Sequence, residues 1–218
     1  MAVKQQLFGE LAKIAQAIAS PQRLELLDYV AQAERSVDAL SQLMNLSVAN
    51  TSKHLQVLKQ CALVKVRTKG NQRLYYVACD EVVELINSLR KTAERQLLEV
   101  NHLIDTYISK EETLAPVTSD ELFQLVEQGE VLVLDIRPEE EYAQGHIATA
   151  INVPPETMQQ TLGKLEASEK TIVTYCRGPY CLFAHDAVQC LQQKGFKARR
   201  LIEGFPEWKA AGFPVSSN

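Results

Sequence analysis

Residues 46–58, LSVANTSKHLQVL, are the most informative segment for the fold of the first half of the chain. It predicts a helix that begins at about Val48 and ends at about Gln60. A polar break before it separates a shorter helix, expected between Ser36 and about Met44. Two β-like segments follow, Leu63–Thr68 and Arg73–Ala78, which are rich in Val, Leu and Tyr and flank a Gly-Asn turn. A short helix, a turn, a second helix and a β-hairpin follow the order of a winged helix-turn-helix.

Helical periodicity predicts further elements on both sides of this stretch. Apolar positions recur at helical spacing in Leu7–Ala19, and Ser20-Pro21 then begins a second helix that reaches about Gln32. Asp80 can cap one long helix through about Ser109. The apolar stripe of this long helix is too extensive for a solitary surface helix, so it suggests packing against the first helix or against a second subunit.

The charge distribution singles out the region of the hairpin. The 218 residues carry a formal net charge of −4, which combines +1 over residues 1–113 with −5 over residues 114–218. From Ser47 to Cys79 there is no acidic residue, and the basic side chains give this stretch a local charge of +6. The overall negative charge therefore does not exclude nucleic acid as a partner.

The second helix of this arrangement fits the major groove of double-stranded DNA, and its first turns present small, amide and basic side chains. Basic residues near the tip of the hairpin can contact the DNA backbone or the minor groove. The residues predicted to bind DNA are Ser47, Ala49, Asn50, Ser52, Lys53, His54, Arg67, Lys69 and Arg73.

At these positions the chain resembles the ArsR/SmtB family of repressors. The resemblance covers about residues 5–105 and rests on Leu46-Ser47, Thr51–Leu58, Leu63-Val64, Gly70 and Tyr75-Tyr76-Val77. It implies a homodimer, formed through the first and last helices, that binds a roughly palindromic operator as a repressor.

Metal sites of the kinds common in that family are not predicted. One kind needs a Cys-x-Cys pair on the helix before the recognition helix, and residues 36–44 hold no cysteine. The other needs Asp-x-His and then His-x-x-Glu on the last helix. His102 and Asp105 could mimic its second half, but its first half falls on Leu89 and Lys91. No metal and no cofactor are therefore expected.

Two further cysteines, Cys61 and Cys79, flank the hairpin. Two thiols at the base of a wing could form a redox pair that shifts the DNA contacts. The alternative is that both are small buried hydrophobic residues.

The second half of the chain follows a different pattern. Val131–Ile136 and Thr171–Tyr175 are continuous apolar strands, Ala198–Ile202 is a third candidate, and helical segments separate them. This alternation predicts an α/β domain with a mostly parallel sheet. The fold class is therefore a two-domain combination of α+β and α/β. A mostly α winged helix-turn-helix with a β-hairpin wing spans residues 1–110, a linker spans 111–117 and the α/β domain spans 118–218.

The strand Thr171–Tyr175 runs into the loop CRGPYC, residues 176–181, and then into a helix. Backbone N–H groups and the helix dipole stabilise a thiolate at such a position, and Arg177 adds a cation. Cys176 is therefore the predicted nucleophile, with Arg177 as an auxiliary catalytic group and Cys181 as a possible resolving thiol. The predicted substrate-binding residues are Arg177, Gly178 and Tyr180.

This half resembles the rhodanese sulfurtransferases over about residues 117–214. The motifs that carry the resemblance are Asp135-Ile136-Arg137, Glu141-Tyr142, Gly145-His146-Ile147, Ala150–Pro154, the Cys176 loop and Gly204–Trp208. The resemblance implies that the Cys176 thiolate takes a sulfane sulfur from thiosulfate, polysulfide or another persulfide and passes it on from a persulfide.

The polar residues of these motifs, Asp135, Arg137, Glu141 and His146, are expected to hold the fold. The alternative for His146 is a role as a general base. Related phosphatase-type proteins need a longer loop that closes with Arg, whereas position 182 here is Leu. The short loop suits sulfur rather than phosphate.

Cys181 favours a sensing role over steady turnover, because a second thiol can resolve a persulfide or a sulfenate into a disulfide. The main hypothesis is a one-component repressor whose operator binding responds to sulfur or oxidant chemistry at Cys176. The first alternative is an active sulfurtransferase with an autoregulatory DNA-binding half, and the second is a metal- or arsenic-responsive repressor. The chain has neither an apolar run of membrane length nor a signal peptide, so no membrane partner and a cytoplasmic location are expected.

Overall fold

The computed structural model describes residues 2–108, 114–165 and 170–218. Contacts divide the chain into two compact units, Met1–Ile86 and Asn87–Asn218. No helix of the described residues is long and apolar enough to cross a membrane.

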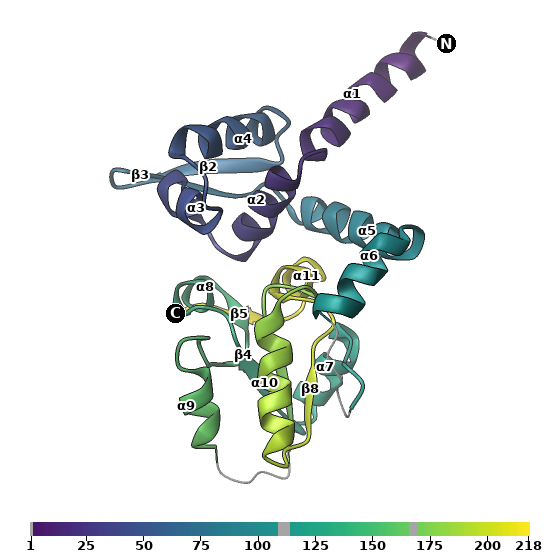
Figure 1. Cartoon of the computed structure of the whole chain (residues 1–218). Helices are drawn as coiled ribbons and strands as arrows, with labels where there is room; N and C mark the ends of the chain where they lie inside the picture. The colour runs from purple at the N-terminus through teal and green to yellow at the C-terminus, as the bar shows by residue number, and fades with distance from the viewer. Residues whose placement is uncertain (1, 109–113, 166–169) are drawn as a thin grey trace. The chain divides into compact units, whose positions relative to one another are not determined.

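The first unit is a winged helix-turn-helix (Figure 1). Its helices are α1 (Ala2–Ile18), α2 (Pro21–Gln32), α3 (Val37–Leu43) and α4 (Val48–Gln60), and the start of α5 (Asp80–Gln96) completes it. An antiparallel sheet has the order β1-β3-β2, with β1 at Arg35–Ser36, β2 at Val64–Lys69 and β3 at Gln72–Val77. The two-residue strand β1 is too short to leave a pattern in the sequence, and it was not predicted.

Local signals set the bounds of α4, which match the prediction. The Ser47 side chain accepts a hydrogen bond from the Asn50 N–H at 3.2 Å, as an N-cap does. Thr51, Leu55 and Leu58 recur on one face and are fully buried. The leucines pack with Leu26 of α2 and Leu40 of α3. The opposite face of α4 is thereby left on the surface.

The single long helix expected from Asp80 is wrong. The helix α5 ends at Gln96, Leu97 adopts an extended conformation, and the chain continues in α6 (Leu98–Leu103) and a π-helical turn, η1, at Ile104–Ile108. No residue of α6 is buried among the described residues, so packing within the chain does not enforce one continuous helix. The periodicity runs through the break because Leu97 and Leu98 are both apolar. The expected end at Ser109 lies outside the described residues.

The second unit has a parallel four-stranded sheet in the order β6-β4-β7-β8. The strands are β4 (Val131–Asp135), β6 (Ile151–Asn152), β7 (Thr171–Tyr175) and β8 (Ala198–Arg200). One face packs on α7 (Ser119–Glu127) and α11 (Phe205–Ala210), and the other packs on α9 (Met158–Gly163) and α10 (Leu182–Gln193). Because both faces are covered, β4 and β7 are apolar without alternation.

Smaller elements complete the second unit. The helix α8 (Glu139–Gln144) leads into β5 (His146–Ile147), which pairs antiparallel with β9 (Val215–Ser216). The sequence did not predict these short elements, because none is long enough to show a repeated hydrophobic pattern. Residues 111–113 of the predicted linker lie outside the described residues, while Val117 already pairs with Leu201 beside the sheet. The domain limits at 110 and 118 stay a prediction.

A buried polar network ties together the ends of β4 and β7. The Arg137 guanidinium donates to both carboxylate oxygens of Asp135, at 2.6 Å from Nη2, and also to the Gly145 carbonyl oxygen. The Tyr175 hydroxyl donates to Asp135 at 2.5 Å and accepts from the Ile147 N–H. Burial raises the pKa of Tyr175 well above its ordinary value, and the Asp135 charge adds to this. Asp135 and Arg137 therefore hold the fold, as expected.

The lone tryptophan, Trp208, is buried in the second unit and allows this network to be tested. We expect Arg137→Met to lower the free energy of unfolding of the second unit by about 3–5 kcal/mol, because it leaves the Asp135 carboxylate buried without its cation. Urea unfolding followed by Trp208 fluorescence measures this. Leu55→Ala, in the core of the first unit, serves as the control and leaves the Trp208 transition in place. An unchanged midpoint for Arg137→Met would show that the network is not a stability determinant.

Candidate functional site

The exposed face of α4 carries most of the residues predicted to bind DNA. Ala49, Asn50 and Lys53 are exposed, and Ser52 and His54 are partly exposed. Ser47 is exposed as well, although its side chain is already used as the cap of the helix. Small side chains at the start of a helix allow its backbone to approach base edges closely. This surface is compatible with insertion into a major groove, and the individual contacts stay predictions.

The wing presents its basic residues on both faces. In the register of β2 and β3, Arg67 lies opposite Leu74, and Thr68 lies opposite Arg73. Since side chains alternate along a strand, Arg67 and Lys69 share one face and Arg73 lies on the other. Lys69 and Arg73 are exposed near the turn, where Gly70 adopts a positive φ of 59°.

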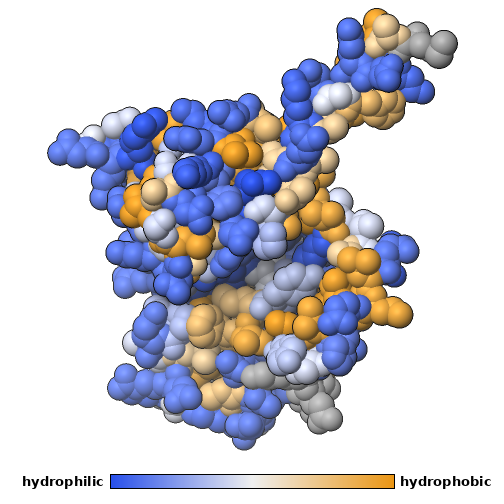
Figure 2. Space-filling view, turned by 45° about the horizontal axis from the view of Figure 1, so that its top comes forward, coloured by the Kyte–Doolittle hydropathy of each residue, from blue (hydrophilic) through white to orange (hydrophobic). Residues whose placement is uncertain are grey.

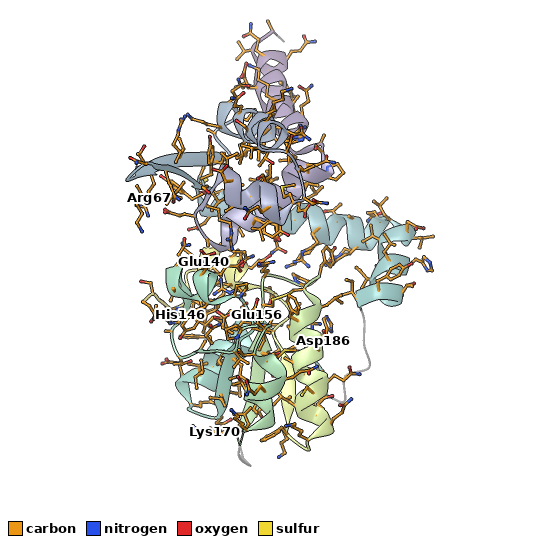
Figure 3. All side chains as sticks on the ribbon, turned by 60° about the vertical axis from the view of Figure 1, so that its left-hand side comes forward. Arg67, Glu140, His146, Glu156, Lys170 and Asp186 are labelled. Carbon is orange, nitrogen blue, oxygen red and sulfur yellow. A yellow bond between two sulfur atoms is a disulfide. The ribbon has the colours of Figure 1, made fainter. Side chains whose placement is uncertain are left out.

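Arg67, which is labelled on the wing in Figure 3, is paired with a carboxylate. Its Nε donates to Glu34 Oε2 at 2.6 Å, and this hydrogen bond, followed by the charge of Glu34, raises the pKa of Arg67. Glu34 just precedes β1, so sequence reasoning on the hairpin alone missed it. Glu34 therefore competes with a DNA phosphate for the Arg67 guanidinium.

Cys61 and Cys79 are free thiols in this structure. Cys61 is partly buried and its sulfur lies 3.7 Å from the Lys13 carbonyl oxygen. Cys79 is exposed, and a hydrogen bond from its thiol to the Glu81 carboxylate raises the pKa of Cys79. A raised pKa lowers the thiolate fraction and hence the reactivity. Their pairing stays a prediction.

The Cys176 loop begins where the central strand β7 ends. Cys176 is 2% exposed, and Cys181 occupies the N-cap position of α10. The structure joins the two sulfurs in a disulfide across five positions of sequence, with the Cα atoms 6.2 Å apart. The Cys181 N–H also donates to the Gly178 carbonyl oxygen at 3.1 Å. The loop therefore brings together the two thiols that the sequence singled out.

Arg177 points toward a carboxylate rather than into solvent. Its Nε and Nη2 donate to both oxygens of Glu141 on α8, the shortest distance being 2.6 Å. Glu141 is fully buried and the Arg177 side chain is 21% exposed. The cation predicted to orient an anionic donor is therefore already compensated. A role for Arg177 in binding substrate stays a prediction, and it would act together with Glu141.

The backbone at the start of α11 packs against the backbone of the cysteine loop, a contact that the sequence did not predict. The Phe205 N–H donates to the Cys176 carbonyl oxygen at 3.3 Å. A Cβ on Gly204 would overlap the Arg177 backbone and lie 2.7 Å from Gly178 Cα. Only glycine lets these backbones approach so closely. The Gly-Phe-Pro sequence before α11 is the signal that could have revealed this contact.

His146 is 5% exposed, its Nδ1 lies 2.9 Å from the Tyr142 carbonyl oxygen, and its ring stacks on Tyr142. These contacts favour a structural role. Within the part of the chain that the structure describes, no group of three or more His, Cys, Asp or Glu side chains could hold a metal ion.

Tyr180, the remaining predicted substrate-binding residue, lies on the rim of the loop and is 44% exposed. Its hydroxyl donates to Glu94 Oε1 at 2.8 Å. Burial and this hydrogen bond raise the pKa of Tyr180 to about 12, so the hydroxyl keeps its proton at neutral pH.

Two known families match separate parts of the chain. Residues 20–66 match the family described as bacterial regulatory protein, arsR family, and residues 118–211 match the rhodanese-like domain. The α4 surface falls within the first match and the Cys176 loop within the second.

Individual relatives cover either the whole chain or one half. The HTH-type transcriptional regulator Rv0324 of Mycobacterium tuberculosis is 36% identical over 216 residues, which is 97% of this chain and 92% of that protein. The thiosulfate sulfurtransferase GlpE of Coxiella burnetii is 31% identical over 91 residues, 41% of this chain and 82% of that protein. The NMR structure of a homodimeric winged helix-turn-helix DNA-binding domain, Mb0332 from Mycobacterium bovis, is 32% identical and has a TM-score of 0.41. The match covers 43% of this chain and 87% of that domain.

The order of the two matches and the relative that spans nearly the full length agree with the two folds seen in the structure. The chain belongs to the HTH-type transcriptional regulators of the arsR family and carries a C-terminal rhodanese-like domain.

Proposed function

We propose that the chain is an operator-binding repressor whose affinity for DNA falls when Cys176 reacts with a sulfane sulfur or an oxidant. The disulfide between Cys176 and Cys181 is the observation that carries this proposal. It provides a stable second state of the loop, as a switch requires. An enzyme that only passes sulfur from donor to acceptor has no use for such a state.

The chemistry of the switch balances with a persulfide, RSSH, as the donor. The Cys176 thiolate attacks the terminal sulfur of the donor, the S–S bond of the donor breaks, and RS⁻ leaves, while the transferred sulfur keeps its proton as the Cys176 persulfide, Cys–S–SH. The Cys181 thiolate then attacks the Cys176 sulfur and releases HS⁻. Two thiols have lost two electrons to the sulfane sulfur, which departs as sulfide. An oxidant reaches the same disulfide through a sulfenate at Cys176 and loss of water.

A second candidate function is sulfur transfer by turnover, with thiosulfate or polysulfide as the donor and a thiol or cyanide as the acceptor. The match to the rhodanese-like domain and the GlpE relative favour it. The proximity of Cys181 to Cys176 argues against sustained turnover, since Cys181 competes with the external acceptor for the Cys176 persulfide.

The DNA-binding form in this proposal is a homodimer that reads two half-sites of a roughly palindromic operator. The helix α1 supports this, because its only buried residue is Ala17 while Val3, Leu7, Phe8 and Leu11 are 59–69% exposed. These four side chains recur on one face of α1, and hydrophobic surface is visible on this helix in Figure 2. A solitary amphipathic helix of this length is marginal in water, so a second copy provides a natural cover for the stripe.

The coupling of cysteine chemistry to DNA binding can be measured directly. We expect polysulfide or mild peroxide to weaken binding of the full chain about ten-fold or more to a duplex that the reduced protein has selected from a random library. Under both treatments the Cys176→Ser variant keeps the operator affinity of the untreated protein, because it cannot form the disulfide. Cys190→Ser, at a partly buried position on α10, is the matched control and responds as the wild type does. Equal affinities for wild type before and after treatment would refute the proposal.

Sensing and turnover differ in the role of Cys181. We expect thiosulfate:cyanide sulfurtransferase activity of the wild type to stall as the Cys176–Cys181 disulfide accumulates. Cys181→Ser then raises the number of turnovers several-fold, since the persulfide survives until cyanide arrives. Mass spectrometry of the loop reports the stalled species. Undiminished turnover by the wild type, with no crosslink, would favour the sulfurtransferase function instead.

The dimer interface can be broken by charge. Leu7→Glu together with Leu11→Glu places two carboxylates in the apolar stripe of α1, and we expect sedimentation to show a monomer. Operator affinity should fall about 100-fold or more, because the second half-site is no longer linked to the first. Gly9→Glu with Gln16→Glu adds the same charge on the opposite face of α1, where both positions are exposed and a Cβ on Gly9 meets nothing within 4 Å, and should leave the dimer intact. A dimer that survives the leucine substitutions would place the interface elsewhere.

A further inference from the structure

We propose that Tyr180 and the second half of α5 form the contact through which the state of the cysteine loop is read out. The inference rests on the proposed redox function and supplies the residues that carry its signal. Tyr180 directly precedes Cys181, and the residues of α5 that it touches, Arg90 and Glu94, belong to the same compact unit as the loop.

Four interactions make up this contact. The Tyr180 hydroxyl donates to Glu94 Oε1 at 2.8 Å. The Arg90 guanidinium lies 5.9 Å from the centre of the Tyr180 ring, within the range of a cation–π interaction. Arg90 is held in turn by Glu94, one turn along the helix at 3.3 Å, and by the Asn87 side chain. The Arg90 side chain is only 13% exposed, so this group is a packed contact and not a loose surface charge.

Arg90 also interacts electrostatically with Glu207 on α11, the helix whose start packs against the cysteine loop. Burial raises the pKa of Glu207 on α11, and the positive charge of Arg90 acts in the opposite direction. Glu207 accepts a hydrogen bond from the Gly204 N–H at 3.1 Å, at the place where α11 supports the Cys176 backbone. Arg90 therefore interacts with Tyr180, which is part of the cysteine loop, and its charge acts on Glu207 at the start of α11, which packs against the loop.

The disulfide restrains Tyr180 because it fixes both ends of a short segment. Cys176 is anchored at the end of β7 and Cys181 at the start of α10, and residues 177–180 lie between the two bonded sulfurs. Opening the disulfide removes this restraint, and residue 180 is next to the sulfur that is set free. Since the Tyr180 hydrogen bond lies at a partly exposed rim, it forms or breaks at modest cost.

The helix α5 is suited to carry the result, because it follows β3 of the wing after only two residues. Val82 in its first turn is buried in the core that also holds Leu55 and Leu58 of α4. The contact at Arg90 and Glu94 therefore lies on a helix whose first turn is part of the DNA-binding core. Tyr180, Arg90 and Glu94 act in this proposal as positioning residues, and none of them takes part in the sulfur chemistry.

The test uses the full chain with Tyr180→Phe, which removes the hydroxyl and keeps the ring, and with Glu94→Leu, which removes the oxygen that accepts the hydrogen bond from that hydroxyl. For Glu94→Leu, which lies outside the loop, we expect polysulfide to form the Cys176–Cys181 disulfide as fully as in the wild type. For both variants, operator affinities are compared once mass spectrometry shows complete conversion to the disulfide. The ratio of operator affinities between dithiol and disulfide states, ten-fold or more in the wild type, should fall to about two-fold or less. Tyr107→Phe, at a tyrosine that is 67% exposed, is the control and keeps the wild-type ratio.

Hydrogen exchange separates this inference from the proposed function. Amides of residues 88–96 should exchange more slowly in the disulfide state than in the dithiol state of the wild type, and Tyr180→Phe should abolish the difference. If the wild type binds the operator equally well in the dithiol and disulfide states while this exchange difference is present, the proposed function is wrong, but the coupling of the loop to α5 is supported. If Tyr180→Phe and Glu94→Leu keep the full affinity ratio, or if exchange in α5 is the same in both states, the inference is overturned.

Discussion

The buried ion pair between Asp135 and Arg137 is the constraint on which the reactive site depends. It fixes the end of β4, and through the Tyr175 hydroxyl it fixes the last residue of β7, so that Cys176 leaves the sheet at a defined point. Arg137 also lies 4.1 Å from the ring centre of Phe205, whose N–H supports the Cys176 carbonyl oxygen. Burial lowers the pKa of Arg137, but the charge and the hydrogen bond of Asp135, together with Tyr175 and Glu141, outweigh burial and raise it. The pair therefore stays ionised while it holds the loop.

Much of this architecture could be predicted from the sequence, and the failures have physical causes. The helix at Val48–Gln60 and the strand at Thr171–Tyr175 have the predicted bounds because strong local signals, a Ser47 cap and a doubly buried apolar run, agree with their packing. The break at Leu97 was missed because periodicity reports which side chains are apolar and not whether a partner covers them. The short strands leave no pattern at all.

The candidate sites show the same division between local and long-range information. The loop around Cys176 could be found from residue order, since its chemistry lies within six positions. Its long-range partners could not be found in that way. Glu141 compensates Arg177 from 36 positions away, Glu34 pairs with Arg67 across 33, and Glu94 accepts from Tyr180 across 86. Each of these contacts occupies a basic or aromatic side chain that the sequence predicts to bind DNA or substrate.

One titration measures whether formation of the disulfide releases the DNA. Fluorescence anisotropy of a labelled operator bound to the full chain is followed as an organic persulfide is added, and samples at each step are analysed for the Cys176–Cys181 disulfide by mass spectrometry. We expect the loss of operator binding and the formation of the disulfide to share one midpoint and a dithiol reductant to reverse both. Complete formation of the disulfide with unchanged anisotropy, or release of DNA before any disulfide forms, would refute this coupling.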